Sequence, residues 1–355
     1  MPQIVLKSSD KNIIIRKTLR AIVSSLVKIT WPLIPDSFFL GKINILGIAL
    51  TRICNSNCIF CPYQFISKDK KIPMSNEVFN AVINNIKKFK IQSVMLPPDV
   101  GEPTSAPDFM QKIKAMRIAG VKNIQCTTNG TLLHKIGIKR ILEDGPDQIN
   151  ISTAGFSEDM YRRVYRSNLY ENMRANILAL LEENKNREKP AIINVWLRGD
   201  EKKARLLAAM EMKIVMESAS EVCIMNEVDP WNGMIHQNML SGSLKIQEDF
   251  PILTHRPCAV LKQINIHPNG DINACSCRNM GQDPDLYLGN IMEVDLMTAY
   301  QRIKKIFSQW REGKVPNICK KCYMYSDIAD RSLGHLRDLY SNKRTYISNK
   351  IKPEF

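Results

Sequence analysis

The sequence lacks any apolar run long enough to cross a membrane. None of its stretches reaches the roughly 18 consecutive apolar residues that a spanning helix requires. It has no internal repeat and no low-complexity tract, and its first residues show no apolar core followed by a small-residue cleavage site, so we expect no secretory leader. With 44% hydrophobic residues in 355, the chain is neither disordered nor fibrous, and it can bury one large core.

Cysteine is too scarce for a scaffold held together by disulfides. The ten cysteines are nevertheless clustered, and their positions are 54, 58, 61, 126, 223, 258, 275, 277, 319 and 322. Because we expect a cytoplasmic protein, grouped thiols indicate metal binding or redox chemistry. Cys126 and Cys223 fall within apolar runs and are interpreted as ordinary buried thiols.

Six apolar, β-branched runs alternate with helical stretches in the first two thirds of the chain. The predicted strands are Ile43–Leu50, Ser93–Leu96, Asn123–Thr127, Gln148–Ser152, Ala191–Leu197 and Ser220–Met225. The predicted helices lie near 75–89, 107–119, 133–143, 157–186 and 201–217, the fourth with Ser157 as its N-cap. This pattern predicts an α/β fold, a partial (β/α)6 TIM-like barrel, in which chemistry belongs to the loops after the strands.

The alternation ends near residue 228, where Asp229-Pro230-Trp231-Asn232-Gly233 is rich in turn formers. Beyond it, Pro268-Asn269-Gly270 lies between two short alternating runs and predicts a β-hairpin. We therefore divide the chain into a basic amphipathic N-terminal segment (1–42), the barrel (43–228), a linker (229–257), a small cysteine-rich α+β domain (258–330) and a basic C-terminal tail (331–355).

The first cysteine group has the spacing C-x3-C-x2-C in the loop directly after the first strand. Cys54, Cys58 and Cys61 are one ligand short of a structural zinc site, whereas a 4Fe-4S cluster held by three thiolates keeps one iron open. Together with Phe60, this segment resembles the radical S-adenosylmethionine (SAM) superfamily. A partial zinc site is the alternative interpretation.

The resemblance covers roughly residues 43–225 and implies an enzyme with a bound cofactor. In this family SAM binds the open iron and is cleaved reductively, and the resulting 5′-deoxyadenosyl radical abstracts hydrogen from the substrate. The segment Gly101-Glu102-Pro103 resembles the motif that binds the methionine amino group, with Val100 in place of the family's first glycine. The alternative for Glu102 is a solvated loop acid.

Further cofactor contacts are implied by the same resemblance. They are Phe60 beside the cluster, Asn129 in Thr128-Asn129-Gly130, Ser152 at the ribose, and the carboxylate-binding or substrate-binding candidates Arg166 and Arg198. The alternatives are a small residue at a strand end for Ser152, and surface or helix-face positions for the two arginines.

The second cysteine group resembles the SPASM/twitch extensions of the same superfamily. Cys258, Cys275, Cys319 and Cys322 match the shorter twitch form, which holds one auxiliary 4Fe-4S cluster, and Gly270-x4-Cys275 is the sharpest part of the match. A full SPASM domain needs more cysteines after Cys322. Cys277 is an alternative to Cys275, and a structural zinc is the alternative to the cluster.

The resemblance implies a radical SAM oxidoreductase with two 4Fe-4S clusters and an external one-electron donor such as flavodoxin or ferredoxin. The ligand spacings are especially similar to those of 2-deoxy-scyllo-inosamine dehydrogenases, which implies dehydrogenation of a carbohydrate or cyclitol-like small molecule. One alternative is a SPASM-type radical maturase with a peptide substrate. Another is a non-catalytic metal-binding module that docks to membrane or nucleic acid. The residue that deprotonates the substrate radical is not identified.

The net charge of +15 includes a basic N-terminal segment with seven Lys/Arg and two Asp/Glu in residues 1–42. A predicted helix there places Ile15, Leu19, Ile22, Val23 and Leu26 on one face, and Trp31, Phe38 and Phe39 follow. This segment either lies peripherally on the inner membrane surface or packs on the barrel. No nucleic-acid recognition motif is present in the sequence, so we expect no nucleic acid partner.

Overall fold

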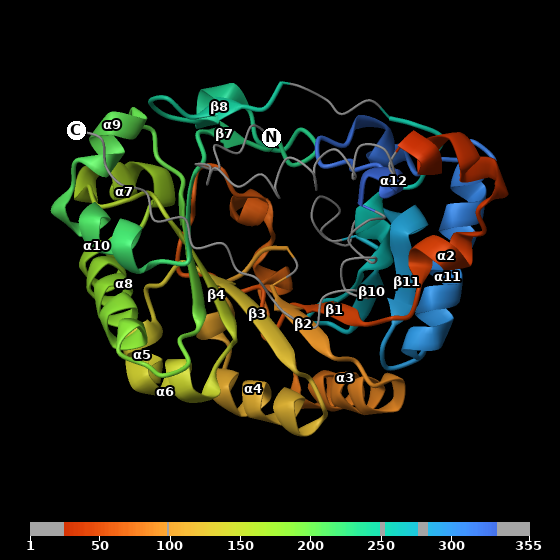
Figure 1. Cartoon of the computed structure of the whole chain (residues 1–355), viewed down its shortest axis with the longest axis horizontal. Helices are drawn as coiled ribbons and strands as arrows, with labels where there is room; N and C mark the ends of the chain where they lie inside the picture. Colours follow the sequence, from red (N-terminus) through yellow and green to blue (C-terminus); the bar gives the residue numbers. More distant parts are fainter. Residues whose placement is uncertain (1–24, 98, 249–252, 276–282, 332–355) are drawn as a thin grey trace.

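The computed structural model describes residues 25–97, 99–248, 253–275 and 283–331 (Figure 1). Six parallel strands lie side by side in chain order: β1 (Ile45–Ile48), β2 (Ser93–Leu96), β3 (Asn123–Thr128), β4 (Gln148–Thr153), β5 (Ile192–Leu197) and β6 (Glu221–Ile224). An arc of helices covers one side of these strands (Figure 1): α3 (Asn76–Phe89), α4 (Phe109–Ile118), α5 (Leu133–Ile136), α6 (Ile138–Asp144), α8 (Tyr170–Lys185) and α10 (Met210–Ser218). The predicted βα alternation and partial barrel are confirmed.

The predicted hairpin is also present, and it extends the same sheet. β9 (Ile264–Ile266) pairs in parallel with β1, and β10 (Asp271–Asn273) pairs antiparallel with β9. Gly270 takes a φ of +89° at the turn, a conformation that favours glycine. β11 (Tyr287–Asn290) follows antiparallel to β10, and α11 (Leu296–Arg311) packs against β11. The sheet order is therefore β11-β10-β9-β1-β2-β3-β4-β5-β6.

The two faces of the sheet differ in chemistry. Apolar side chains such as Ile124, Ile149 and Ile193 are fully buried in the core that the helices cover. The alternate positions form in-register rows on the opposite face, which we call the inner face. Its polar members include Gln125, Thr127, Gln148, Asn150, Asn194, Asn265 and Asn273.

Three predicted helices are broken in the structure, so the predictions of single helices were wrong there. The stretch 133–143 divides into α5 and α6 at Gly137, whose φ is +96°. The stretch 201–217 divides into α9 (Lys203–Leu207) and α10. The stretch 157–186 divides into α7 (Glu158–Tyr165) and α8, and Ser157 caps α7 by accepting from the backbone N–H of Met160, as predicted.

The N-terminal aromatic residues differ in exposure. The helix predicted for residues 15–26 lies largely outside the described residues. Trp31, in a 3-10 helix (Trp31–Leu33), and Phe39, in α2 (Asp36–Leu40), are 2% and 1% exposed, and their ring centroids are 4.7 Å apart. Arg311 of α11 lies 4.1 Å from the Trp31 ring centroid. Of the three aromatic residues that the sequence offered for contact with a membrane surface, only Phe38 is exposed, at 57%.

Three further short elements lie outside this sheet and its main helices. β7 (Glu227–Val228) and β8 (Lys245–Ile246) form a small parallel pair at the rim of the barrel (Figure 1), and α12 (Ile328–Arg331) follows the last cysteines. Among the residues that the structure describes, no helix is both long and apolar enough to span a bilayer.

Candidate functional site

The three thiols of the first cysteine group face one another in the loop after β1. Burial, followed by the charge of Glu102, raises the pKa of Cys54 to about 12, and Cys61 contributes to the same rise. Burial also raises the pKa of Cys58, and the nearby charges of Cys61 and Cys54 add to it. Each thiolate therefore opposes ionisation of its neighbours, so a cationic metal group is what would stabilise all three.

Three thiols are one fewer than a structural zinc site uses, and they are the donor set of a 4Fe-4S cluster with one open iron. Within the described ranges, no three Cys, His, Asp or Glu side chains converge on one metal-ion position. A tetrahedral zinc site requires its sulfurs about 2.3 Å from one ion. A cubane places each thiolate on a different iron, so its ligands stand farther apart.

The cysteine loop is held by the end of α7. The backbone N–H groups of Asn57 and Ile59 donate to the carbonyl oxygens of Tyr165 and Val164, at 3.2 and 3.0 Å. These carbonyls belong to the last turn of α7, where they lack partners within the helix. Because the loop satisfies them, α7 ends here, and Arg166 adopts a φ of +47°.

A buried amide network joins the same loop to the end of β3. Asn129 Nδ2 donates to Asn55 Oδ1 at 2.7 Å and to Ser56 Oγ at 3.3 Å. Asn129 Oδ1 accepts from both the N–H and the hydroxyl of Thr131. The predicted cofactor residue Asn129 thus positions the loop, and Asn55 and Thr131 are partners that the motif alone did not single out.

Glu102 is 2% exposed and accepts four hydrogen bonds. Its Oε1 accepts from the N–H and hydroxyl of Thr104 and from the hydroxyl of Thr128, and its Oε2 accepts from the N–H of Asn129 at 2.7 Å. Burial raises the pKa of Glu102 even against these hydrogen bonds. Glu102 is therefore a buried acid beside Cys54, and Oε2 accepts one hydrogen bond from the described residues, so it keeps a lone pair for a further donor.

Gly101 allows the segment Gly101-Glu102-Pro103 to approach the cysteine loop closely. Gly101 has a φ of +113°, and a Cβ at this position would come within 2.3 Å of the carbonyl oxygen of Thr51. The next N–H, of Glu102, donates to the carbonyl oxygen of Ile53 at 2.8 Å. Pro103 follows as the first residue of a buried 3-10 helix.

The other predicted cofactor residues gather around Tyr165 at the end of α7. The hydroxyls of Ser152 and Tyr165 are 2.9 Å apart, and Phe60 meets the Tyr165 ring edge-on with centroids 5.4 Å apart. The Arg198 guanidinium lies 5.0 Å from the Phe60 ring centroid, and its Nε has no hydrogen-bond partner among the described residues. Arg166 lies farther out and donates to Gln64 Oε1 at 3.2 Å.

Tyr165 was not identified from the sequence. Its position four residues after Tyr161, in a helix that follows a strand of the barrel, was the available signal, and the two rings stack with centroids 5.1 Å apart. Burial and the charge of Cys58 raise the pKa of Tyr165, so its hydroxyl stays protonated as a hydrogen-bond donor.

The second cysteine group lines one small cavity. Cys258 precedes a 3-10 helix (Ala259–Lys262), and Cys275 follows β10. Cys319 lies within the 3-10 helix Asn317–Lys321, and Cys322 is the residue directly after it. The remaining lining is largely apolar: Val260, Leu261, Met324 and Tyr325. Burial and the charges of Cys322 and Cys258 raise the pKa of Cys319. The four thiols fit one shared metal group, and Cys277 lies outside the described residues.

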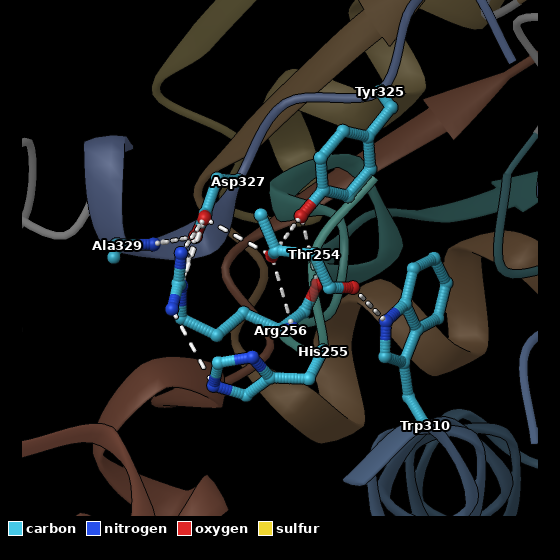
Figure 2. A network of polar contacts seen from close by, with 7 residues as sticks. All are labelled: Thr254, His255, Arg256, Trp310, Tyr325, Asp327 and Ala329. Carbon is cyan, nitrogen blue, oxygen red and sulfur yellow. Dashed lines mark hydrogen bonds and ion pairs between the residues drawn. The ribbon is translucent and has the colours of Figure 1, made fainter. Parts of the chain in front are cut away.

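A buried ion pair holds the segment before Cys258 (Figure 2). Arg256 Nε lies 3.0 and 2.8 Å from the two carboxylate oxygens of Asp327, and Arg256 Nη2 lies 2.6 Å from Oδ2. Asp327 also accepts from the Thr254 hydroxyl and the Ala329 N–H. Residues 254–258 are thereby fastened to 325–329, and the N–H of Ser326 points at the Cys258 sulfur at 3.5 Å.

Replacing Asp327 by Asn should destabilise the protein strongly. The variant leaves the Arg256 charge buried, at 7% exposure, without its counter-ion, a change that costs about 3–5 kcal/mol. We expect a lower thermal midpoint for the anaerobic holoprotein and earlier loss of the second metal group on heating. Glu312→Gln, at the exposed Lys314–Glu312 pair, is the matched control and should change little. An unchanged midpoint for Asp327→Asn would show that the pair is not needed.

Comparisons with known proteins agree with this arrangement. A model of the radical SAM superfamily matches residues 48–211, and a model of an iron-sulfur cluster-binding domain, SPASM, matches residues 258–323. A probable GTP 3′,8-cyclase of Saccharolobus islandicus is 34% identical over 119 residues, which are 34% of this chain and 37% of the cyclase. The match thus spans little more than a third of that relative.

Two solved structures are similar at low sequence identity. SuiB of Streptococcus suis bound to its precursor peptide SuiA is 12% identical, with a TM-score of 0.54 over 87% of this chain and 75% of SuiB. BtrN in complex with AdoMet and 2-DOIA is also 12% identical, with a TM-score of 0.47 over 79% of this chain and 92% of BtrN. Both similarities are too distant to indicate a substrate.

Proposed function

Because the chain belongs to the radical SAM superfamily and carries a C-terminal SPASM domain, we propose that it oxidises a carbohydrate or cyclitol-like substrate by a radical mechanism. Cys54, Cys58 and Cys61 would hold the 4Fe-4S cluster that binds SAM, and Cys258, Cys275, Cys319 and Cys322 would hold an auxiliary 4Fe-4S cluster. When bound, SAM and its reduced cluster supply the 5′-deoxyadenosyl radical that abstracts hydrogen. A flavodoxin or ferredoxin would be the electron source.

The observation that carries the proposal is the presence of two separate groups of thiols, one in the loop after β1 and one around a cavity beyond the end of β10. The first has three thiols at the end of β1, which leaves an iron for SAM. The second has four thiols around a cavity, so a 4Fe-4S cluster held there would have no open iron and would suit electron transfer. Removal of a hydrogen atom, a proton and an electron from one carbinol group is a two-electron oxidation.

The inner face of the barrel favours a substrate rich in hydroxyl groups. None of the residues of β2 to β5 is charged. Instead, amides and hydroxyls are linked across the strands: Asn194 Nδ2 and Gln148 Nε2 both donate to Asn150 Oδ1, at 2.9 and 3.0 Å, and Asn150 Nδ2 contacts Thr127 Oγ1 at 3.4 Å. Side-chain amides both donate and accept, so they match the paired donor and acceptor roles of sugar hydroxyls.

The proposal is tested by anaerobic incubation of the reduced protein with SAM and a panel of cyclitols, aminocyclitols and sugar nucleotides. We expect 5′-deoxyadenosine together with a ketone that is two hydrogens lighter than its substrate, in a one-to-one ratio. Substrate deuterated at the reacting carbon should pass deuterium to 5′-deoxyadenosine. Liquid chromatography with mass spectrometry measures all three.

Other outcomes would assign the protein differently. Activity only on a peptide with a leader sequence would support a maturase and contradict the carbohydrate substrate. A redox-neutral product would contradict the role of the auxiliary cluster as electron acceptor. Bound zinc without any 5′-deoxyadenosine would overturn the enzymatic proposal and favour a metal-binding module.

A further inference from the structure

The helical segment ahead of the barrel packs on the rest of the protein through one of its sides. Residues 25–30 are α-helical, and the 3-10 helix Trp31–Leu33 follows them directly. Val27 and Trp31 are four residues apart and therefore lie on the same side of this segment. They are 8% and 2% exposed and belong to the hydrophobic core, so this side already has its packing partners.

The opposite side of the segment is apolar as well, but it faces away from the core. Leu26, Ile29 and Leu33 follow one another at the helical spacing of three and four residues, and they are 54%, 76% and 84% exposed. An ordinary surface helix places polar side chains on its outward side. Large apolar side chains grouped there indicate a contact surface. We call these three residues the outer stripe.

Contacts of Arg311 in α11 fix the orientation of this segment. Arg311 Nη1 donates to the carbonyl oxygen of Trp31 at 3.1 Å, and Arg311 Nε lies 2.6 Å from Asp36 Oδ1. The Trp31 ring lies between this guanidinium, at 4.1 Å, and the Phe39 ring, at 4.7 Å. A rotation that buried the outer stripe would expose Trp31 and break these contacts. The outward position of the stripe therefore belongs to the folded state.

The sequence continues the outer stripe towards the N-terminus. Ile15, Leu19 and Ile22 precede Leu26 at the same alternating spacing of four and three residues. A helix over this stretch, which the sequence predicts, carries one apolar stripe that is about five turns long.

The charge of the segment indicates the chemistry of its partner. Residues 1–42 contain seven Lys/Arg and two Asp/Glu, and Lys28 and Lys42 are exposed. A second copy of this chain would bring two such basic segments together, which like-charge repulsion disfavours. The matching partner instead offers an apolar layer together with negative charge. An anionic lipid bilayer has both, in its acyl chains and its phosphate headgroups.

We propose that the outer stripe docks this protein on the surface of an anionic lipid bilayer. Leu26, Ile29 and Leu33 enter the boundary between headgroups and acyl chains, where an amphipathic helix lies in the plane of the membrane. Val27 and Trp31 attach the segment to the barrel from the opposite side, so the barrel stays on the water side. This inference is independent of the proposed oxidation, because none of these residues belongs to either cysteine group.

The test is co-sedimentation of the full-length anaerobic holoprotein with lipid vesicles. The vesicles contain phosphatidylcholine alone or phosphatidylcholine mixed with phosphatidylglycerol. We expect the protein to bind the mixed vesicles and to bind them less tightly as the salt concentration rises, because salt screens the attraction between headgroups and basic side chains. Binding to phosphatidylcholine alone should be weaker by about tenfold or more.

The double variant Ile29→Ser with Leu33→Ser removes most of the described stripe. It should bind the mixed vesicles about 10²-fold less tightly, because each aliphatic side chain withdrawn from water contributes roughly a tenfold factor. Both side chains are exposed, so the thermal midpoint should not fall. The matched control is Ile118→Ser with Met210→Ser, at positions that are 72% and 88% exposed on α4 and α10, away from α2 (Figure 1). This control should bind like the wild type.

Several outcomes would overturn the inference. Absence of binding to the mixed vesicles, equal binding by the wild type and the stripe variant, or binding that salt leaves unchanged would exclude an anionic bilayer as the partner. A lipid-free wild type that is dimeric in analytical ultracentrifugation, with a monomeric stripe variant, would assign the stripe to a second copy. A lower thermal midpoint for the stripe variant would show that another part of the chain covers the stripe.

Discussion

Replacement of Cys54, Cys58 and Cys61 together by Ala should leave about four of the eight irons expected for two 4Fe-4S clusters and reduce SAM cleavage to background. The three thiols oppose one another's ionisation, and a bound cationic metal group would relieve that repulsion. The second group is unaffected because its thiols line a separate cavity. Iron analysis, EPR after reduction and 5′-deoxyadenosine yield measure the effect.

The control for the triple variant is Cys223→Ser, at a β6 thiol that lines neither cysteine group. It should keep about eight irons and full cleavage. If the triple variant kept all its iron or still released 5′-deoxyadenosine, the first site would lie elsewhere in the chain.

The converse double variant, Cys258→Ala with Cys319→Ala, should keep SAM cleavage and lose the oxidised product. Both thiols face the cavity of the second group, and Cys258 is 8% exposed within the core. With two of four ligands removed, about four irons should remain. Hydrogen abstraction continues because the loop after β1 is intact, but the substrate radical has no electron acceptor.

The measurement is the ratio of ketone to 5′-deoxyadenosine, together with deuterium returned to the substrate. We expect the ratio to fall from about one to near zero, because the substrate radical cannot pass on the second electron that ketone formation requires it to lose. A ratio that stayed at one would contradict the acceptor role. A full iron content would contradict the ligand assignment, and zinc in place of iron would favour the structural alternative.

The strands of the barrel were predictable because they are short runs in which apolar residues, many of them β-branched, recur at alternate positions. Ser93–Leu96 coincides with β2, and the Asn269-Gly270 turn identified the hairpin. Local periodicity carries this information without knowledge of distant contacts.

The break between α7 and α8 was not predictable in the same way. It depends on hydrogen bonds from Asn57 and Ile59 to a helix more than a hundred residues later. No proline or glycine interrupts residues 157–186, so the sequence alone predicts one helix.

The candidate site also has residues that local sequence motifs identify and residues that only the folded chain brings together. Motif spacing identified the cysteines, and the cavity around Cys258 and its three partners is consistent with that grouping. Tyr165 belongs to no motif, and only the folded chain brings its ring against Phe60 and its hydroxyl to Ser152.

The parallel pairing of β9 with β1 has a consequence for electron flow. Tunnelling between redox centres weakens steeply with distance, so a useful electron path needs a separation that thermal motion does not vary. The loop after β1 carries the first thiols, and the hairpin of β9 and β10 leads to Cys275. Neighbouring strands are held about 4.8 Å apart by backbone hydrogen bonds. With clusters bound at both cysteine groups, as we propose, this pairing would keep the separation between them constant even if the connection between β6 and β9 changed in length.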